Sequence, residues 1–291
     1  MIKLLLIIVP LILSIMLYTL AERKVQASIQ MRVGPNIVGP YGILQPLTDG
    51  LKLLFKEILI PQRSYLIIFT LSPLLSFLLS LALWLFYYLL DSYLGILILL
   101  AIGGLELYGI LLGGWASKNK YTLVGAIRTT SQLISYELIL GMIYFILALS
   151  IGSFRFYYFN LLPINNLLIY LPLYLITLIV ILAETNRVPF DLPESESETV
   201  AGFFVEHSAI IFALYFLAEY SNMIFLSYLF SVLYTSSLIL LPIHLFYYLW
   251  IRATLPRLRY DHLILLSWYN LLPITLAFLI LSLSIITSKL L

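Results

Sequence analysis

The chain contains no cysteine and few charged residues, since Asp, Glu, Lys and Arg make up only 10% of its 291 residues. Without cysteine it holds no disulfides, thiolate-held iron–sulfur clusters or cysteine-based zinc sites. Histidine is also scarce. A haem would need two of the isolated residues His207, His244 and His262, which are more typical of packed or interfacial side chains. We therefore expect no metal and no flavin to be bound by this chain.

Apolar residues dominate instead. Hydrophobic residues make up 62% of the chain and the mean hydropathy is +1.05, far above the range of soluble domains. The apolar runs are continuous rather than alternating, so we predict an all-α integral membrane protein, one domain over residues 1–291. Runs of about 20 residues predict an eight-helix transmembrane bundle. The predicted spans are 2–21, 66–90, 94–115, 134–152, 164–183, 202–222, 226–250 and 267–288.

The basic residues are distributed unevenly about these spans. All but Lys3, Arg155 and Lys289 of the 16 Lys and Arg residues fall in loops on one side. Lys and Arg resist translocation, so this asymmetry supports the span count and places both termini on the opposite, outer face. The ordered inward-facing loops are then the regions where polar chemistry is expected.

The first inward loop contains a predicted amphipathic helix over residues 46–59. Pro46 suits the first position of a helix. Apolar residues then recur at helical spacing, and polar residues occupy the other face. On composition, the helix is either a membrane-surface anchor or the floor of a site at the bilayer surface.

A second inward feature is the acidic loop, residues 184–201. Half of the 14 acidic residues lie between Ala183 and Tyr220. Pro193 favours a helix start, and acids in the first turn of a helix are stabilised there. Glu194 and Glu196 are therefore also explained as solvated capping residues. That explanation does not extend to the deeper Glu206.

Glu106 lies about midway along the third predicted span, among glycines that let another helix approach closely. It is interpreted as a proton-relay member or as a buried, hydrogen-bonded acid, and ionisable residues at this depth favour the first reading. Glu137 lies just inside the fourth span and is equally explained by solvation at the interface. Glu219 lies about 20 Å beyond Glu206 along a helix axis. This distance favours a separate part of any carboxylate chain, or the far interface with Asn222.

Five segments resemble, in order along nearly the whole chain, the signatures of a known family. They are AERKVQASIQMRVGPNIVGPYGILQPLTDGLKLLFKE, GGWASKNKYTLVGAIRTTSQLISYE, AETNRVPFDLPESESETVAGFFVEH, FLAEY and RATLPRLRYDHL. The family is chain 1 of proton-pumping NADH:ubiquinone oxidoreductase, the membrane subunit at the heel of respiratory complex I. The sequence departs from the usual family pattern at Thr199, His207, His262 and Tyr269.

The resemblance implies a ubiquinone chamber shared with two hydrophilic subunits that flank the terminal iron–sulfur cluster. It also implies contacts with other membrane-arm subunits and phospholipid, but not with nucleic acid. Matched by position, the residues that the resemblance assigns to the quinone passage are Arg23, Arg32, Asp49, Phe55, Arg187 and Phe190. The proton-coupling set is Glu106, Glu137, Glu184, Asp191, Glu194, Glu196, Glu206 and Glu219. No complete active site is expected in this chain alone, because the electrons come from a neighbouring subunit.

The resemblance further implies the mitochondrial inner membrane, with the basic loops on the matrix side, or a bacterial plasma membrane. Three other functions stay open. A subunit of an ion-translocating hydrogenase shares the bundle but does not need the amphipathic segment. A stand-alone secondary transporter normally carries an internal repeat, and none stands out here. A passive assembly scaffold predicts that the carboxylates can be neutralised without effect.

Overall fold

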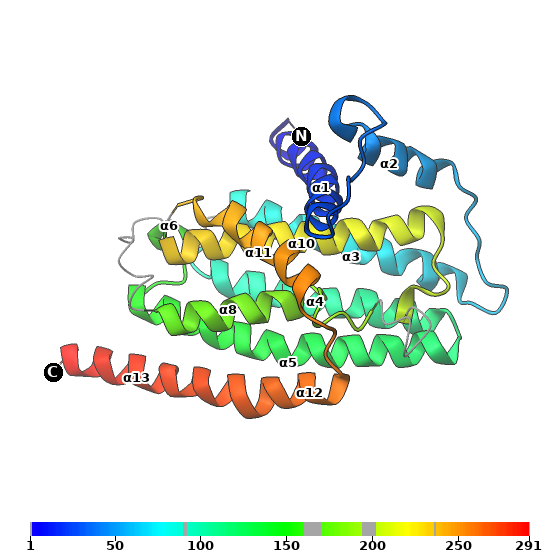
Figure 1. The fold of residues 1–291 in the computed structure, drawn as a ribbon. Coiled ribbons are helices and arrows are strands. Elements are labelled where there is room, and N and C mark those ends of the chain that lie inside the picture. Colours follow the sequence, from blue (N-terminus) through cyan, green and yellow to red (C-terminus); the bar gives the residue numbers. More distant parts are fainter. Residues whose placement is uncertain (1, 90–91, 160–169, 194–201, 236, 291) are drawn as a thin grey trace.

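The computed structural model describes residues 2–89, 92–159, 170–193, 202–235 and 237–290, and every regular element in these ranges is a helix. Long helices run alongside one another in a bundle (Figure 1). They are α3 (Leu66–Leu89), α4 (Gly95–Ala116), α5 (Lys120–Ile151), α8 (Leu171–Glu184), α10 (Ala209–Thr235) and α13 (Leu272–Leu290). The α13 helix continues α12 (Tyr260–Leu265) through a π-helical turn, η3 (Leu266–Leu271).

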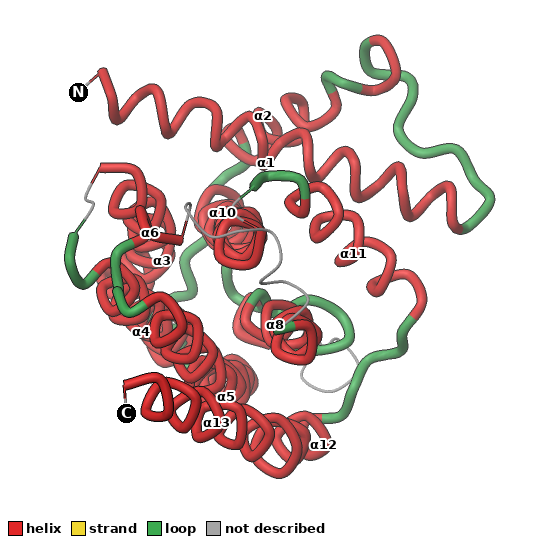
Figure 2. Tube along the Cα trace, turned by 90° about the vertical axis from the view of Figure 1, so that its left-hand side faces the viewer, coloured by secondary structure: helices red, strands yellow, loops and turns green. Residues whose placement is uncertain are grey.

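Figure 2, which looks along the bundle, shows α8 and α10 between two groups of helices. On one side α3, α4, α5 and α13 form a curved layer. On the other side lie α1 (Ile2–Ile29), which crosses the bundle at a steep angle, α2 (Gln45–Phe55) and α11 (Leu240–Thr254). Short elements complete the chain: η1 (Pro40–Gly42), α6 (Phe156–Phe159) and η2 (Gly202–Phe204).

Local sequence sets the limits of α5. The Asn119 side chain accepts a hydrogen bond from the amide of Tyr121 and caps the first turn. The helix ends at Gly152, which adopts the left-handed conformation with φ of 78° that glycine tolerates. Between these ends the helix also includes residues 120–133, which the span prediction left in a loop. Three of its polar side chains, Thr122, Thr129 and Gln132, are buried against neighbouring helices rather than solvated.

Six of the described helical segments are long and apolar enough to cross a membrane. They are Leu6–Ile29, Leu66–Tyr87, Gly95–Ala116, Lys120–Ile151, Ala209–Thr235 and Tyr260–Ser284. The chain is therefore an all-helical, multi-pass membrane protein. The described parts of α8 and α11 contain 14 and 15 residues, which is shorter than the about 20 needed for a full span. The predicted count of eight is not reached by this criterion.

The predicted boundaries around residues 202–250 are wrong. Residues 202–208 form a 3-10 turn and a loop, and α10 begins only at Ala209. The helix then continues without the expected break near residue 224 and ends at Thr235. The turn lies instead between α10 and α11. Its position could not be predicted because hydrophobicity changes little along this part of the chain. A helix, α2, covers only part of the range predicted for the amphipathic helix 46–59, and it ends at Phe55 because Lys56 adopts an extended backbone conformation.

Candidate functional site

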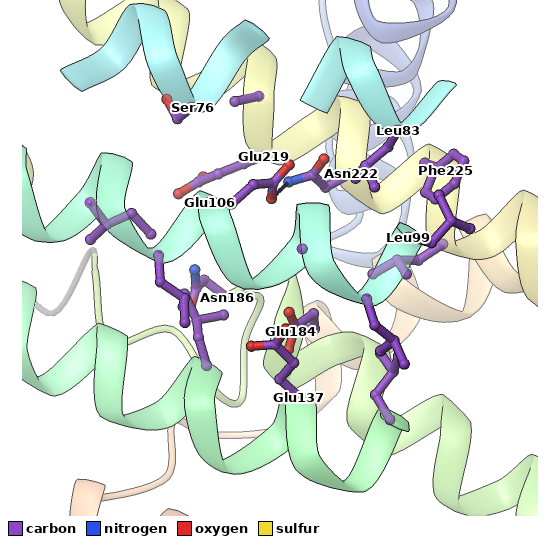
Figure 3. Close-up of a pocket in the computed structure, with 18 of the residues that line it drawn as sticks. Ser76, Leu83, Leu99, Glu106, Glu137, Glu184, Asn186, Glu219, Asn222 and Phe225 are labelled. Atoms are coloured by element: carbon purple, nitrogen blue, oxygen red, sulfur yellow. Dashed lines mark hydrogen bonds between the residues drawn. The ribbon is translucent and has the colours of Figure 1, made fainter. Parts of the chain in front are cut away.

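Four glutamates line one cavity inside the bundle, with a volume of about 90 Å³. Glu106 comes from α4, Glu137 from α5, Glu184 from the end of α8 and Glu219 from α10. Figure 3 shows Glu106 and Glu219 toward the α10 side, and Glu137 and Glu184 toward α5. A water needs on the order of 10–15 Å³ and two to four polar partners, so the cavity accommodates several waters. We call this space the carboxylate cavity.

Asparagine side chains complete the polar lining of this cavity. Asn222 on α10 donates a hydrogen bond of 2.5 Å to Glu106 Oε2, while Glu106 Oε1 is buried without a hydrogen-bond partner among the described residues. Glu184 is close enough to Glu137 and Glu106 to be affected by their charges. Carboxylates that share a small space repel one another when all are ionised, so such a set holds protons that it can exchange.

Glycine gives Glu137 its place in the cavity wall. A Cβ atom added to Gly104 would stand 2.9 Å from Glu137 Oε1, whereas one added to Gly103 would stand 3.9 Å away. The carboxylate therefore lies directly against the α4 backbone at Gly104. No other residue type leaves this space free.

A buried ion cluster lies beside the carboxylate cavity. Glu22 of α1 is 5% exposed and pairs with Arg187, at 3.3 Å, and with Arg252 of α11. Its second oxygen accepts a hydrogen bond of 2.5 Å from the Tyr220 hydroxyl on α10. The Arg187 guanidinium also lies 4.2 Å from the Tyr220 ring centroid. We call these four residues the Glu22 cluster.

The loop after α8 positions Arg187. The buried Gln132 amide of α5 donates to the carbonyl oxygens of Ala183 and Phe190, at 2.8 and 2.9 Å, and holds both ends of this loop. Burial alone lowers the pKa of Arg187, but Tyr220 and Glu22 raise that pKa above its ordinary value overall. The guanidinium therefore stays charged inside the protein. Breaking such a buried pair costs about 3–5 kcal/mol.

A third feature is an apolar groove of about 430 Å³ between α1, α2 and α10. Its polar rim contains Arg23 and Asp49, which form an ion pair at 2.5 Å. Tyr220 of the Glu22 cluster also lines the groove. A smaller pocket lined by Arg187, Asn186 and Glu219 follows, and the last two residues also line the carboxylate cavity. The groove and the Glu22 cluster thus share Tyr220. The small pocket connects the cluster, through Arg187, to the carboxylate cavity.

Comparison with known proteins identifies the family. A family model described as NADH dehydrogenase matches residues 2–283. The chain belongs to the NADH dehydrogenase family.

Members of the NADH dehydrogenase family from diverse organisms are similar over nearly their whole length. NADH-ubiquinone oxidoreductase chain 1 of Chondrus crispus is 44% identical and covers 99% of this chain and 96% of its own. An NADH-quinone oxidoreductase subunit of Rickettsia africae is 43% identical, over 98% of this chain and 92% of its own. The NADH-quinone oxidoreductase subunit of the same name from Paramagnetospirillum magneticum is 40% identical, over 97% and 90%.

In this NADH dehydrogenase family member, the predicted quinone-passage residues separate in space. Arg23 and Asp49 meet at the groove rim, and Arg32 lines an adjoining hollow that Arg23 shares. Arg187 belongs to the Glu22 cluster. Phe55 is 85% exposed, and Phe190 is buried against Tyr136 and lines none of these pockets. The two phenylalanines are therefore not placed at the groove.

The predicted proton-coupling residues also divide. Glu106, Glu137, Glu184 and Glu219 meet in the carboxylate cavity, so Glu219 lies with Asn222 beside Glu106 rather than apart from it. Asp191 pairs with Arg257 at 2.9 Å and lines the small pocket. Glu206 does not line the cavity; it accepts a hydrogen bond of 2.8 Å from Asn119. Glu194 and Glu196 lie outside the described residues.

The Glu22 cluster was not predicted from the sequence. Glu22 directly precedes Arg23 and Lys24 at the end of an apolar run, where it is indistinguishable from an ordinary solvated charge. Its partners Arg252 and Tyr220 lie about 200 residues away in the chain. No local pattern indicates its burial, which depends on the helices that carry these distant partners.

Proposed function

We propose that this chain is the membrane subunit of a proton-translocating NADH:ubiquinone oxidoreductase, and that it links quinone reduction to proton movement. Ubiquinone reaches the complex along the groove between α1, α2 and α10. The volume of this groove suits an isoprenoid chain, since ligand sites typically measure about 300–1,000 Å³. Electrons come from a hydrophilic partner subunit that holds the terminal iron–sulfur cluster.

The observation that carries this proposal is that one helix, α10, lines both the groove and the carboxylate cavity. Reduction of a quinone to a quinol consumes two electrons and two protons, and when nearby side chains supply those protons, the charge of the protein beside the quinone changes. Tyr220 faces the groove and donates to Glu22, which also binds Arg187. A change of charge there acts on Arg187 and then on Glu219, next to it in the small pocket. Glu219 passes the change to the other cavity carboxylates.

The proposal extends to the location of the protein. The basic loops face the side that carries the hydrophilic subunits, which is the matrix in a mitochondrion and the cytoplasm in a bacterium. Phospholipid and further membrane-arm subunits cover the outer faces of the bundle. The exposed apolar side chains on α1, α3 and α13, such as Leu13, Leu78 and Ile280, suit these surroundings.

The experiment replaces Glu106→Gln and Glu184→Gln separately in the assembled complex. We expect ubiquinone reduction and proton pumping to fall together, by about tenfold or more, because each variant removes an exchangeable proton. NADH oxidation by an artificial acceptor that bypasses the quinone site should stay near normal, which separates coupling from assembly. The control is Asp261→Asn, whose carboxylate is 67% exposed. Wild-type pumping in both glutamate variants contradicts the proposal and favours a structural role.

A further inference from the structure

His207 is buried in an unusual way. The ring is 7% exposed and stacks on Phe69 of α3, with centroids 4.4 Å apart. Neither ring nitrogen has a hydrogen-bond partner among the described residues. Buried polar atoms are nearly always satisfied, and those that are not call for an explanation such as a bound water or a catalytic role.

Three polar atoms converge where His207 meets α4. A Cβ atom added to Gly113 would stand 2.2 Å from the Tyr215 hydroxyl, 3.2 Å from Ser72 Oγ and 3.4 Å from His207 Nε2. The absent side chain of Gly113 therefore makes room for the Tyr215 hydroxyl and brings it close to Ser72 Oγ and His207 Nε2. A water that joins His207 Nε2 to these hydroxyls satisfies the buried ring nitrogen.

This group of side chains lies between Glu206 and the carboxylate cavity. On the outer side, Glu206 directly precedes His207 and is held at the start of α5 by Asn119. On the inner side, Tyr215 lines the carboxylate cavity together with Glu106 and Glu219. His207, in the loop just before α10, and Tyr215, on α10, thus lie between Glu206 and the cavity.

The two buried histidines differ in their freedom to exchange protons. His244 Nδ1 faces the Ser227 carbonyl oxygen at 3.3 Å, and its Nε2 faces the Tyr174 hydroxyl at 2.9 Å. A carbonyl accepts a hydrogen bond but gives no proton, so His244 is held in one tautomer. Neither tautomer of His207 is fixed by a group among the described residues. His207 can therefore take up a proton at one ring nitrogen and release one from the other, whereas His244 cannot.

We infer that His207, with Tyr215 and Ser72, holds an ordered water and forms a proton route from the Glu206 rim into the carboxylate cavity. The ring accepts a proton at Nδ1 and releases the Nε2 proton to the water, so it stays neutral and changes tautomer. The Tyr215 hydroxyl, which donates to the Gly109 carbonyl oxygen at rest, accepts the water's proton and turns its own proton from Gly109 to a cavity carboxylate. The inference rests on the proposed function, because it supplies protons to the same cavity.

The test compares His207→Phe and His207→Tyr in the assembled complex. Phenylalanine keeps the stacking on Phe69 but removes both nitrogens, whereas tyrosine restores a group that can bind water. We expect His207→Phe to lower pumping and ubiquinone reduction about three- to tenfold, with normal artificial-acceptor activity, and His207→Tyr to recover at least half of the loss. The exposed His262 serves as the control, as His262→Phe.

Two outcomes overturn the route. One is wild-type pumping in His207→Phe; the other is equal impairment in the Phe and Tyr variants, which indicates a steric role. Glu106→Gln and Glu184→Gln are assayed in parallel. If they lose pumping and His207→Phe does not, only the route fails, whereas if they too retain pumping, the proposed function fails. Independently, a structure of the wild-type complex that resolves water must place one between His207 Nε2 and the Tyr215 hydroxyl, and a partner-subunit group in that position contradicts the inference.

Discussion

At the residue scale, Gly104 offers a test of the Glu137 position. Gly104→Ala places a methyl group 2.9 Å from Glu137 Oε1, and the flexible carboxylate end moves away from it. We expect a loss of proton pumping by severalfold with little change in stability. Gly103→Ala is the matched control, because its methyl group stands 3.9 Å from the same oxygen. Equal pumping in both variants, measured in sealed vesicles, would show that the carboxylate position is unimportant.

Glu22 predicts a larger effect on stability than any exposed acid. Glu22→Gln removes the carboxylate that pairs with both Arg187 and Arg252, at a cost of about 3–5 kcal/mol. Asp261→Asn removes an exposed pair with Arg259 and should cost less than about 1 kcal/mol. Thermal unfolding of the detergent-solubilised protein measures both. Similar melting temperatures for the two variants would contradict a structural role for the Glu22 cluster.

His207 makes stability depend on pH. Burial disfavours the imidazolium and lowers the pKa of His207 from 6.5 to about 4. Between these values the unfolded chain binds a proton that the folded chain does not. The stabilisation is therefore complete above pH 6.5 and is lost as the pH falls toward 4. Melting temperatures should fall more steeply over this range for the wild type than for His207→Phe, and parallel curves would refute this.

How far the sequence predicts the site depends on where each residue stands in the chain. Glu106 and Glu184 are recognisable because a carboxylate within an apolar run is costly and therefore conspicuous. Glu219 is recognisable too, but its meeting with Glu106 depends on how α10 packs against α4, which no local pattern specifies. Glu22 is not recognisable, because its burial results entirely from distant partners.

At the element scale, α2 is attached to the bundle at two points. The Arg23–Asp49 ion pair joins it to α1, and after α2 the amide of Leu59 donates to the Ser208 hydroxyl just before α10, at 2.9 Å. The Ser208 hydroxyl also donates to the Leu59 carbonyl oxygen at 3.2 Å, and each hydrogen bond contributes about 0.5–1.5 kcal/mol. We expect Ser208→Ala to raise the KM for ubiquinone about two- to tenfold with kcat nearly unchanged. The control is Ser64→Ala, whose hydroxyl bonds only within its own turn; equal KM values in the two variants would contradict the tether.

Element boundaries were predictable only where hydrophobicity changes along the chain. The second and third predicted spans match α3 and α4 within one residue at each end, since polar loops surround them, whereas α1 continues eight residues past the predicted end at residue 21. The start of α5 was missed because its threonines and Gln132 find partners inside the protein. The start of α10 was missed because the turn at residues 202–208 is itself apolar. Hydropathy measures how favourably a segment transfers from water to lipid. The starts of α5 and α10 depend instead on hydrogen bonds and backbone geometry.

At the scale of the whole molecule, the natural absence of cysteine makes topology directly measurable. Single substitutions Arg259→Cys and Arg155→Cys each introduce one thiol, in loops at opposite ends of the bundle. In sealed inner-membrane vesicles of known orientation, an impermeant maleimide should label residue 259 only from the side of the hydrophilic subunits and residue 155 only from the other. Labelling of both from one side would contradict the proposed orientation.

The α10 helix separates two spaces of different character. Phe212, Phe216 and Leu217 face the apolar groove, while Tyr215, Glu219 and Asn222 face the carboxylate cavity. Because one unbroken helix carries both faces, it behaves as a stiff partition. Any displacement of α10 therefore alters both spaces at once. In the proposed function, a hydrophobic guest that displaces α10 from the groove side also moves the acids on its other side, without any atom crossing the helix.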